Sequence, residues 1–247
     1  MNTLLTIVAL AMIATTGTLL YRDTLHDRVI APLNRPRDIG EIRTRVLPQL
    51  EQAMAQQGMT LGAPIYIRIF KEEAELEVWV QDDTSYRLFR SYPICNYSGH
   101  LGPKLAEGDY QSPEGFYAVP RGALNPNSRF HLSFNLGFPN AYDRAHERTG
   151  SYLMVHGDCR SVGCYAMTDP AIEEIYLLAE QALSGGQRAV PVHAFPFHMT
   201  DTRMAQAAGH HWFNFWEGLQ PAYAAFEATH RPPPMRVRGG QYVLAQP

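Results

Sequence analysis

The stretch from Tyr152 to Asp169 reads YLMVHGDCRSVGCYAMTD and joins two kinds of local structure. It opens with a short run of bulky apolar residues, which is typical of a β-strand that ends at His156. It closes on polar residues before a proline, which is typical of the start of a helix. Two of the chain's three cysteines, Cys159 and Cys164, lie in the loop between. The pattern predicts an α+β domain in which one loop begins with a histidine and ends with a cysteine.

Cysteine and histidine in one loop suggest a metal site, a redox pair or a nucleophile with its base. The spacing H-x2-C-x4-C argues against a metal site, because no second closely spaced ligand pair accompanies it. Cys159 and Cys164 also lack the C-x-x-C spacing of redox-active pairs. We therefore expect no metal and no redox centre, and we favour a nucleophile.

Cys164 is the predicted nucleophile, because it follows a turn at Gly163 and precedes the expected helix by a few residues. Free backbone amides and the positive end of a helix dipole would stabilise both a thiolate and an oxyanion. His156 would be held on a rigid strand and take the thiol proton. Ser161 would orient either group or donate to the oxyanion. On spacing alone, a buried histidine beside an inert cysteine is an equally good interpretation.

The 247-residue chain has an ordinary globular composition, with 45% hydrophobic residues and a formal net charge of -3. This is enough apolar material for one large domain or two small ones. The 21 basic residues are scattered rather than clustered, so no nucleic-acid partner is expected.

Residues 4–20 contain no charged residue and are mostly aliphatic, which is typical of an export segment. We expect residues 1–21 to be a cleaved signal peptide or a membrane anchor, and residues 22–40 to be a linker. A buried N-terminal helix is the alternative. Export would place the chain in an oxidising compartment, where three cysteines leave at least one thiol unpaired.

Hydrophobic periodicity divides the rest of the chain into a helix, a β-rich middle and a helical end. Apolar residues at helical spacing predict a helix over about 38–57, which Gly58 ends. A second helix is expected to start with Asp169 as its cap and Pro170 in its first turn, and to end at a Gly-Gly pair. Strands are expected at 63–70, 74–80, 86–92, 116–119, 130–134, 152–155 and 189–195.

The C-terminal third is expected to be helical from Asp201 to Thr229, with an aromatic-rich face that belongs to the core. The tail after it, RPPPMRVRGGQYVLAQP, is expected to be an extended arm. The predicted organisation is a catalytic domain over 41–200, followed by a helical extension and tail over 201–247.

Several of these segments together resemble a known family. The pattern H-G-x3-S-x-G-C at 156–164 is similar to the signature of the YkuD-type L,D-transpeptidases, and the string SVGCYAMTD resembles their YafK-like branch. The segments GPKLAEGDYQSPEGFY (102–117) and LSFNLGFPNAYDRAHERTGSYLMVHG (132–157) resemble the same branch. The resemblance covers at least residues 64–195.

The resemblance implies a β-rich catalytic domain, with mixed sheets or a β-sandwich, that is exported to the periplasm and needs no cofactor. An uncleaved N-terminal segment would anchor it in the inner membrane. Cys164 would be the nucleophile, His156 the base and Gly163 part of the oxyanion-hole turn. The common family pattern has a histidine where Val162 stands and an arginine where Ala166 stands.

Other residues are candidates for substrate binding. Because the common arginine is absent, a substrate carboxylate would be bound elsewhere, and the candidates are Arg160, Tyr165 and Arg144. The segment 110–116 matches the branch and would lie beside the groove for the donor peptide, although its proline and glycine shaping a turn is an equal alternative. The further candidates are Gly157, Tyr110 and Phe116.

The chemistry that the resemblance implies is acyl transfer from a peptidoglycan stem peptide. The diaminopimelate carbonyl at the third stem position would form a thioester, and an amine would then give a 3-3 or 1-3 cross-link. Water as the acceptor would make an amidase or endopeptidase that detaches a peptide or a wall-linked lipoprotein. An inactive wall-binding domain with a buried Cys164 is a third possibility. Cys159 is expected to be a spare thiol or an occasional disulfide partner of Cys164.

Overall fold

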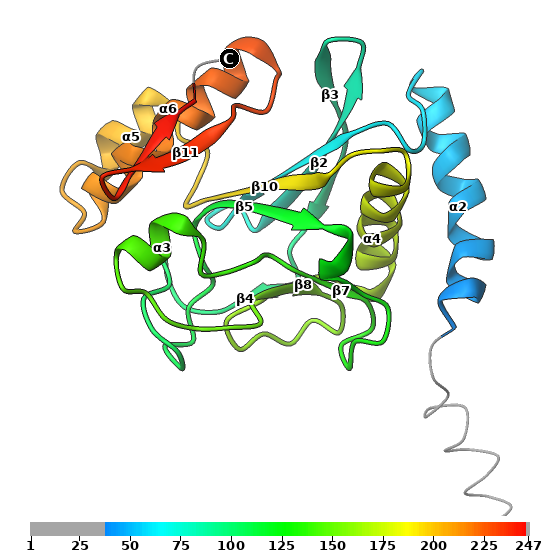
Figure 1. Ribbon diagram of the computed structural model, residues 1–247, viewed down its shortest axis with the longest axis horizontal. Coiled ribbons are helices and arrows are strands. Elements are labelled where there is room, and N and C mark those ends of the chain that lie inside the picture. The colour runs from blue at the N-terminus through cyan, green and yellow to red at the C-terminus, as the bar shows by residue number, and fades with distance from the viewer. Residues whose placement is uncertain (1–37, 246–247) are drawn as a thin grey trace, which may run out of the picture. The chain divides into compact units, whose positions relative to one another are not determined.

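Two five-stranded sheets organise the computed structural model, which describes residues 38–245 (Figure 1). These sheets and their flanking helices confirm the predicted α+β class. The residues from Ile39 onward form one packed unit. The predicted export segment and most of the predicted linker lie outside the described residues. Within 38–245, no helix is long and apolar enough to cross a bilayer.

The larger sheet, sheet A, has the strand order β3-β2-β1-β10-β5. β1 and β10 are parallel, and the other neighbouring strands are antiparallel. The strands that the sequence predicts for this sheet are all confirmed to within two residues. Their bounds are β1 Ile65–Phe70, β2 Glu75–Asp82, β3 Ser85–Pro93, β5 Gly115–Pro120 and β10 Ala189–Phe195.

Both faces of β1 are covered, which is why every one of its side chains is buried. Its isoleucines belong to one apolar cluster with α2 (Ile39–Gln56) and α4 (Asp169–Ser184). Phe70 belongs to a second cluster with the C-terminal helices. The predicted bounds of α2 are confirmed. At α4 the N-cap is Thr168 rather than Asp169, because the Thr168 side chain accepts a hydrogen bond from the amide of Ala171.

The smaller sheet, sheet B, has the order β4-β9-β8-β7-β6, and its strands are two or three residues long. The strands predicted at 130–134 and 152–155 begin later than expected. A 3₁₀ turn, Arg121–Ala123, leads from sheet A to sheet B, and α3, Ala141–Ala145, follows β7. The strand bounds are β4 Asn96–Tyr97, β6 Leu124–Asn125, β7 Ser133–Asn135, β8 Met154–His156 and β9 Tyr165–Ala166.

The C-terminal extension forms two helices, α5 Asp201–Ala207 and α6 Phe213–Thr229. The aromatic face of α6 is buried in the core, as predicted. The tail is not an extended arm, because β11 Met235–Arg238 and β12 Gln241–Leu244 pair as a hairpin. The two glycines between them both have positive φ, which suits a tight hairpin turn. A Gly-Gly pair between two short runs was the sequence signal for this hairpin.

Candidate active site

Cys164 lies immediately before β9, beside the parallel strand β8. Val155 is paired with Tyr165, and His156 is paired with Ala166. Cys164 itself precedes β9, and its sulfur accepts from the amide of Met154. The thiol therefore lies against the backbone of β8, two residues before His156.

Cys164 carries a free, half-buried thiol. The amide of Met154 donates to Sγ at 3.4 Å, and Sγ lies 3.8 Å from the carbonyl oxygen of Tyr152. Burial raises the pKa of the thiol, against the opposing effects of the Met154 bond and the charge of Lys104. The thiol is therefore protonated at neutral pH and needs a base before it can attack a carbonyl.

The raised pKa corrects the expectation that a helix end would stabilise the thiolate. β9 stands between Cys164 and α4, which begins only at Asp169. The Asp169 carboxylate, which belongs to the first turn of that helix, accepts from the amide of Asp158 at 2.8 Å. A helix dipole acts mainly within its first turn, so it gives the thiol little help here.

His156 has a neutral imidazole ring with a defined tautomer. Its Nδ1 lies 2.6 Å from the carbonyl oxygen of Gly157, which can only accept, so Nδ1 carries the proton. Nε2 is then the nitrogen with a free lone pair. Burial lowers the pKa of His156, and the ring of Phe130 packs 4.8 Å from it. Within the described part of the chain, no hydrogen bond joins the ring to the thiol, so the two groups form no preformed ion pair.

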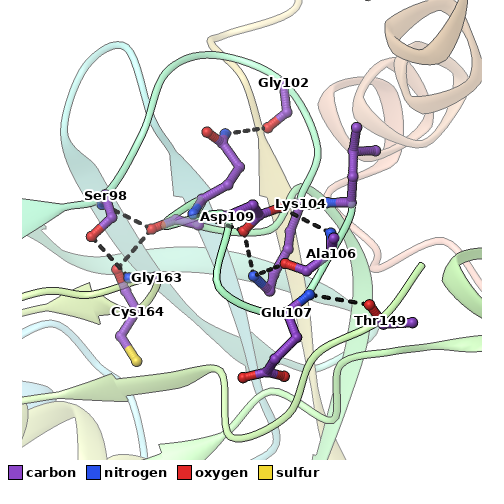
Figure 2. Close-up of polar contacts among 12 residues, drawn as sticks. Ser98, Gly102, Lys104, Ala106, Glu107, Asp109, Thr149, Gly163 and Cys164 are labelled. Carbon is purple, nitrogen blue, oxygen red and sulfur yellow. Dashed lines mark hydrogen bonds and ion pairs between the residues drawn. The ribbon is translucent and has the colours of Figure 1, made fainter.

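Three serine hydroxyls hold the backbone around Cys164, and Figure 2 labels one of them, Ser98. Ser112 and Ser161 donate to the carbonyl oxygen of Cys164 at 2.8 and 2.7 Å. Ser98 accepts from the amide of Gly163 at 2.8 Å and lies 2.7 Å from the Ser161 hydroxyl. We call these three residues the serine cradle. Figure 2 shows the sulfur atom on the side of Cys164 away from these bonds, so the cradle fixes the main chain and leaves the thiol accessible.

The cradle changes the roles expected of two residues. The Gly163 amide is already bonded to Ser98, so it is not free to bind an oxyanion in this arrangement. Across residues 38–245, no acceptor is bonded to the amide of Cys164, which leaves that amide as the available donor. Gly163 has a φ of 106°, which side chains disfavour, so it shapes the turn. Ser161 holds the backbone rather than the thiol or the base.

Cys159 forms a disulfide with Cys95, with an S–S distance of 2.02 Å and a sequence separation of 64. The expectations of a spare thiol at Cys159, or of its occasional pairing with Cys164, are therefore wrong. The amide of Cys95 also donates to the carbonyl of Ala166 at 2.9 Å. The disulfide thus ties the loop 157–164 to the segment that enters β4.

Two of the predicted substrate-binding residues are buried. Tyr165 is 0% exposed, and its hydroxyl donates to the carbonyl of Pro113 at 2.7 Å, so its predicted contact with substrate is wrong. Gly157 is buried as well, and a Cβ there would lie 2.5 Å from the Asp169 carboxylate. Glycine is therefore required by packing, and its carbonyl serves to fix the tautomer of His156.

The other predicted substrate-binding residues divide between the surface and one cavity. Arg160 is exposed, and its guanidinium pairs with Asp158. Tyr110 is 65% exposed and has a φ of 53°. Phe116 on β5 and Arg144 on α3 line the same cavity. The structure thus brings only Phe116 and Arg144 together.

A buried ion pair supports the segment 98–114, which supplies two of the cradle serines. Lys71 and Glu114 are both 0% exposed, and their charged atoms are 3.2 Å apart. The indole N–H of Trp216, on α6, donates to Glu114 at 2.9 Å. Lys71 also donates to the carbonyls of His100, Gly102 and Ser112, at 2.7, 3.0 and 3.0 Å. The C-terminal extension is therefore connected, through Glu114, Lys71 and Ser112, to the backbone of Cys164.

Sequence reasoning missed Ser98 and Lys71 as parts of the site, and it included Ser112 and Glu114 only as members of the segment 110–116 beside the groove. The segment 110–116 carries the family resemblance, which was the signal available for Ser112 and Glu114. Ser98 and Lys71 stand outside every quoted motif, so only their contacts in space identify them.

One group of possible metal ligands exists among the described residues. Glu75, Glu77 and His198 offer ligand atoms within 4.8 Å of one another. Glu77 already accepts from Arg68 and Trp79, each at 2.7 Å. Glu77 is thus committed to an ion pair, and none of the three residues lies on sheet B.

Comparisons with known proteins agree with the resemblance, although no protein-family model matches the chain. The chain is 51% identical over 187 residues to "Putative L,D-transpeptidase YafK" of Escherichia coli strain K12, and the match covers 76% of each protein. The protein of the same name from Escherichia coli O157:H7 gives the same values.

Solved structures give more distant matches. The helical cell shape determining protein Pgp2 from Campylobacter jejuni matches with a TM-score of 0.44 and 17% identity, over 75% of this chain and 79% of that one. Bd1075 from Bdellovibrio bacteriovorus matches with a TM-score of 0.39 and 16% identity, over 66% of this chain and 58% of that one.

Proposed function

The chain belongs to the L,D-transpeptidase family of its Escherichia coli relatives, and we propose that it forms peptidoglycan cross-links by cysteine acyl transfer. The observation that carries this proposal is a free Cys164 thiol against the backbone of β8, the strand that ends in the neutral, buried His156. The proposed substrate is a peptidoglycan stem peptide, and the proposed compartment is the periplasm, where that polymer lies.

The first half of the reaction makes a thioester. Nε2 of His156 takes the thiol proton, and Sγ of Cys164 attacks the carbonyl carbon of diaminopimelate at the third stem position. The oxyanion is stabilised by the free Cys164 amide. The C–N bond to the terminal D-alanine then breaks, and the leaving amine takes the proton from Nε2.

The second half transfers the acyl group to an acceptor. An amine of another stem peptide attacks the thioester carbonyl, and Nε2 takes one proton from that amine. The C–S bond breaks, and Cys164 regains its thiol proton from His156. Diaminopimelate in the acceptor's third position gives a 3-3 cross-link, and an amine at its first position gives a 1-3 cross-link.

Hydrolysis is the second candidate outcome, and the exposure of the loops around the thiol favours it. Tyr152 is 78% exposed and Val162 is 73% exposed, so neither side chain covers the approach to Cys164. Water that reaches the thioester would release a shortened peptide instead of forming a cross-link. The acylation step is the same in both cases.

Purified sacculi incubated with the protein distinguish the two outcomes. Chromatography of the digested material should show new cross-linked dimers with the native protein and none with Cys164→Ala. Release of shortened peptides without new dimers would replace transfer by hydrolysis. No change with the native protein would contradict both outcomes.

A further inference from the structure

A groove runs along the free edge of β5, which is the last strand of sheet A. Two cavities of about 530 and 450 Å³ make up this groove, and they meet at Ala118 and Gly137, which line both. Figure 1 shows β5 between β10 and the strands β7 and β8 of sheet B. The groove therefore lies where the two sheets face each other.

One end of the groove lies beside two residues that contact Cys164, although Cys164 itself lines neither cavity. Tyr152 and Met154 line the smaller cavity, and the same two residues contact the sulfur of Cys164 through their backbone atoms. The larger cavity continues in the other direction to Arg144, with Pro232–Met235 along it. A chain lying in this groove would pass from the thiol along β5 to Arg144.

The register of β5 decides which backbone groups face the groove. Ala118 is paired with Pro191 of β10, and proline has no N–H to donate. This pair is therefore a non-hydrogen-bonded pair of the antiparallel ladder, so the N–H and C=O of Ala118 point away from β10. The Ala118 carbonyl oxygen lies 3.8 Å from the position of a Cβ on Gly137, across the groove.

The other outward positions of β5 are already occupied. The carbonyl of Phe116 accepts from the Asn140 side chain at 2.9 Å, and its backbone also hydrogen-bonds the Tyr242 hydroxyl. Pro120 has no N–H. Ala118 is thus the single residue of this edge that offers both a donor and an acceptor, which suits one residue of a short peptide better than a long added strand.

The charge of the groove is positive. Its lining residues, all within the described chain, include no aspartate or glutamate. Arg144 is exposed and bonded to the carbonyl of Pro139, and it has no ion-pair partner among residues 38–245. Burial lowers the pKa of His193, the other basic side chain in the lining, to about 3, so His193 is neutral. A carboxylate is the complementary ligand group for the Arg144 end.

We propose that this groove binds a short, extended peptide with a free carboxylate, whose main chain exchanges two hydrogen bonds with Ala118 and whose carboxylate pairs with Arg144. This peptide is the stem peptide of the proposed reaction, so the inference rests on the proposed function. The groove holds the peptide beside Cys164, and the Ala118 contact sets its direction.

Binding is tested in the Cys164→Ala background, where no turnover occurs. A synthetic stem tetrapeptide is titrated into the ¹⁵N-labelled protein, and amide shifts are followed by NMR. The Ala118 amide should shift with saturation. Ala118→Pro, which removes the N–H, should raise Kd about ten-fold, and the matched Ala118→Ser, which keeps it, should change Kd by less than about two-fold. Arg144→Gln should weaken binding of the tetrapeptide with a free carboxylate about five-fold. It should not weaken binding of the same tetrapeptide with that carboxylate converted to a carboxamide.

Several results would overturn the proposal that the groove binds the peptide. One such result is an unchanged NMR shift of the Ala118 amide while amides elsewhere in the protein report peptide binding. Another is an equal Kd for Ala118→Pro and Ala118→Ser. Should Ala118→Pro fail to fold, equal effects of Arg144→Gln on the acid and the carboxamide would overturn it. A thioester on Cys164 of the otherwise native protein, found together with any of these results, would leave the proposed function intact. Absence of that thioester would remove the proposed function instead.

Discussion

Sheet A and sheet B each have five strands and share one apolar core, but sheet B also relies on specific side-chain bonds. The strands of sheet A are long, and an apolar core covers both faces of its central strand. The strands of sheet B are two or three residues long, so their ladders are short. Its geometry depends on a disulfide, the serine cradle and a buried ion pair. The proposed chemistry thus lies on the sheet that side-chain bonds hold, and variants should separate activity from stability there.

Removing His156, the proposed base, should have the largest effect on activity. His156→Ala should slow acylation by about 10² to 10⁴-fold, the usual contribution of a positioned general base. The exposed His211→Ala is the matched control and should leave the rate unchanged. Single-turnover mass spectrometry of the acyl-enzyme measures both rates. Equal rates for the two variants would remove His156 from the mechanism.

Breaking the buried ion pair should have the largest effect on stability. Lys71→Met leaves Glu114 buried without its cation, which should lower the free energy of unfolding by about 3–5 kcal/mol. The double variant Lys71→Met with Glu114→Gln removes both charges and should recover part of that loss. Urea unfolding measures the three proteins. If Lys71→Met is as stable as the native protein, the ion pair does not support segment 98–114.

The serine cradle should matter more for activity than for stability. Ser112→Ala removes one donor to the Cys164 carbonyl and should lower the free energy of unfolding by about 1 kcal/mol. We expect acylation to slow about ten-fold, because the main chain that positions Sγ loses a support. Ser184→Ala, whose hydroxyl bonds to the backbone of its own helix, is the control. If Ser112→Ala is acylated at the same rate as Ser184→Ala, the serine cradle contributes to the structure but not to the reaction.

The pH dependence of acylation should follow the pKa of His156, which lies below that of a free histidine side chain. His156 must be neutral to accept a proton, and its pKa lies below the ordinary 6.5, so activity should persist at pH values somewhat below 6.5. Alkylation of Cys164 by iodoacetamide in the His156→Ala variant should rise only above the ordinary thiol value of 9.0. An alkylation midpoint below neutral pH would instead indicate a preformed thiolate.

Long elements could be predicted from the sequence, because their periodicity is local. The helix at 38–57 and the strand at 189–195 follow from apolar spacing alone, and both are confirmed. The strands β8 and β9 have too few residues to show any period. The hairpin in the tail had a local signal, the Gly-Gly pair, which the composition of the proline-rich arm obscured.

The site was predictable only in part for the same reason. The motif singles out Cys164 and His156, and the structure places the Cys164 sulfur against the amide of Met154, two residues before His156 on β8. Ser98 and Lys71 act across sequence separations of 65 and 41 residues, to Gly163 and Ser112, so no local pattern marks them. An odd cysteine count predicts a free thiol, but only the fold shows which two cysteines pair.

Intact-protein mass spectrometry with a stem tetrapeptide tests the central claim most directly. The account predicts a mass increase equal to the tetrapeptide minus its terminal D-alanine, located on Cys164 by peptide mapping and absent from Cys164→Ala. An adduct of the same mass on Cys164→Ala, or no adduct on a native protein whose Cys164 remains open to iodoacetamide, would contradict it.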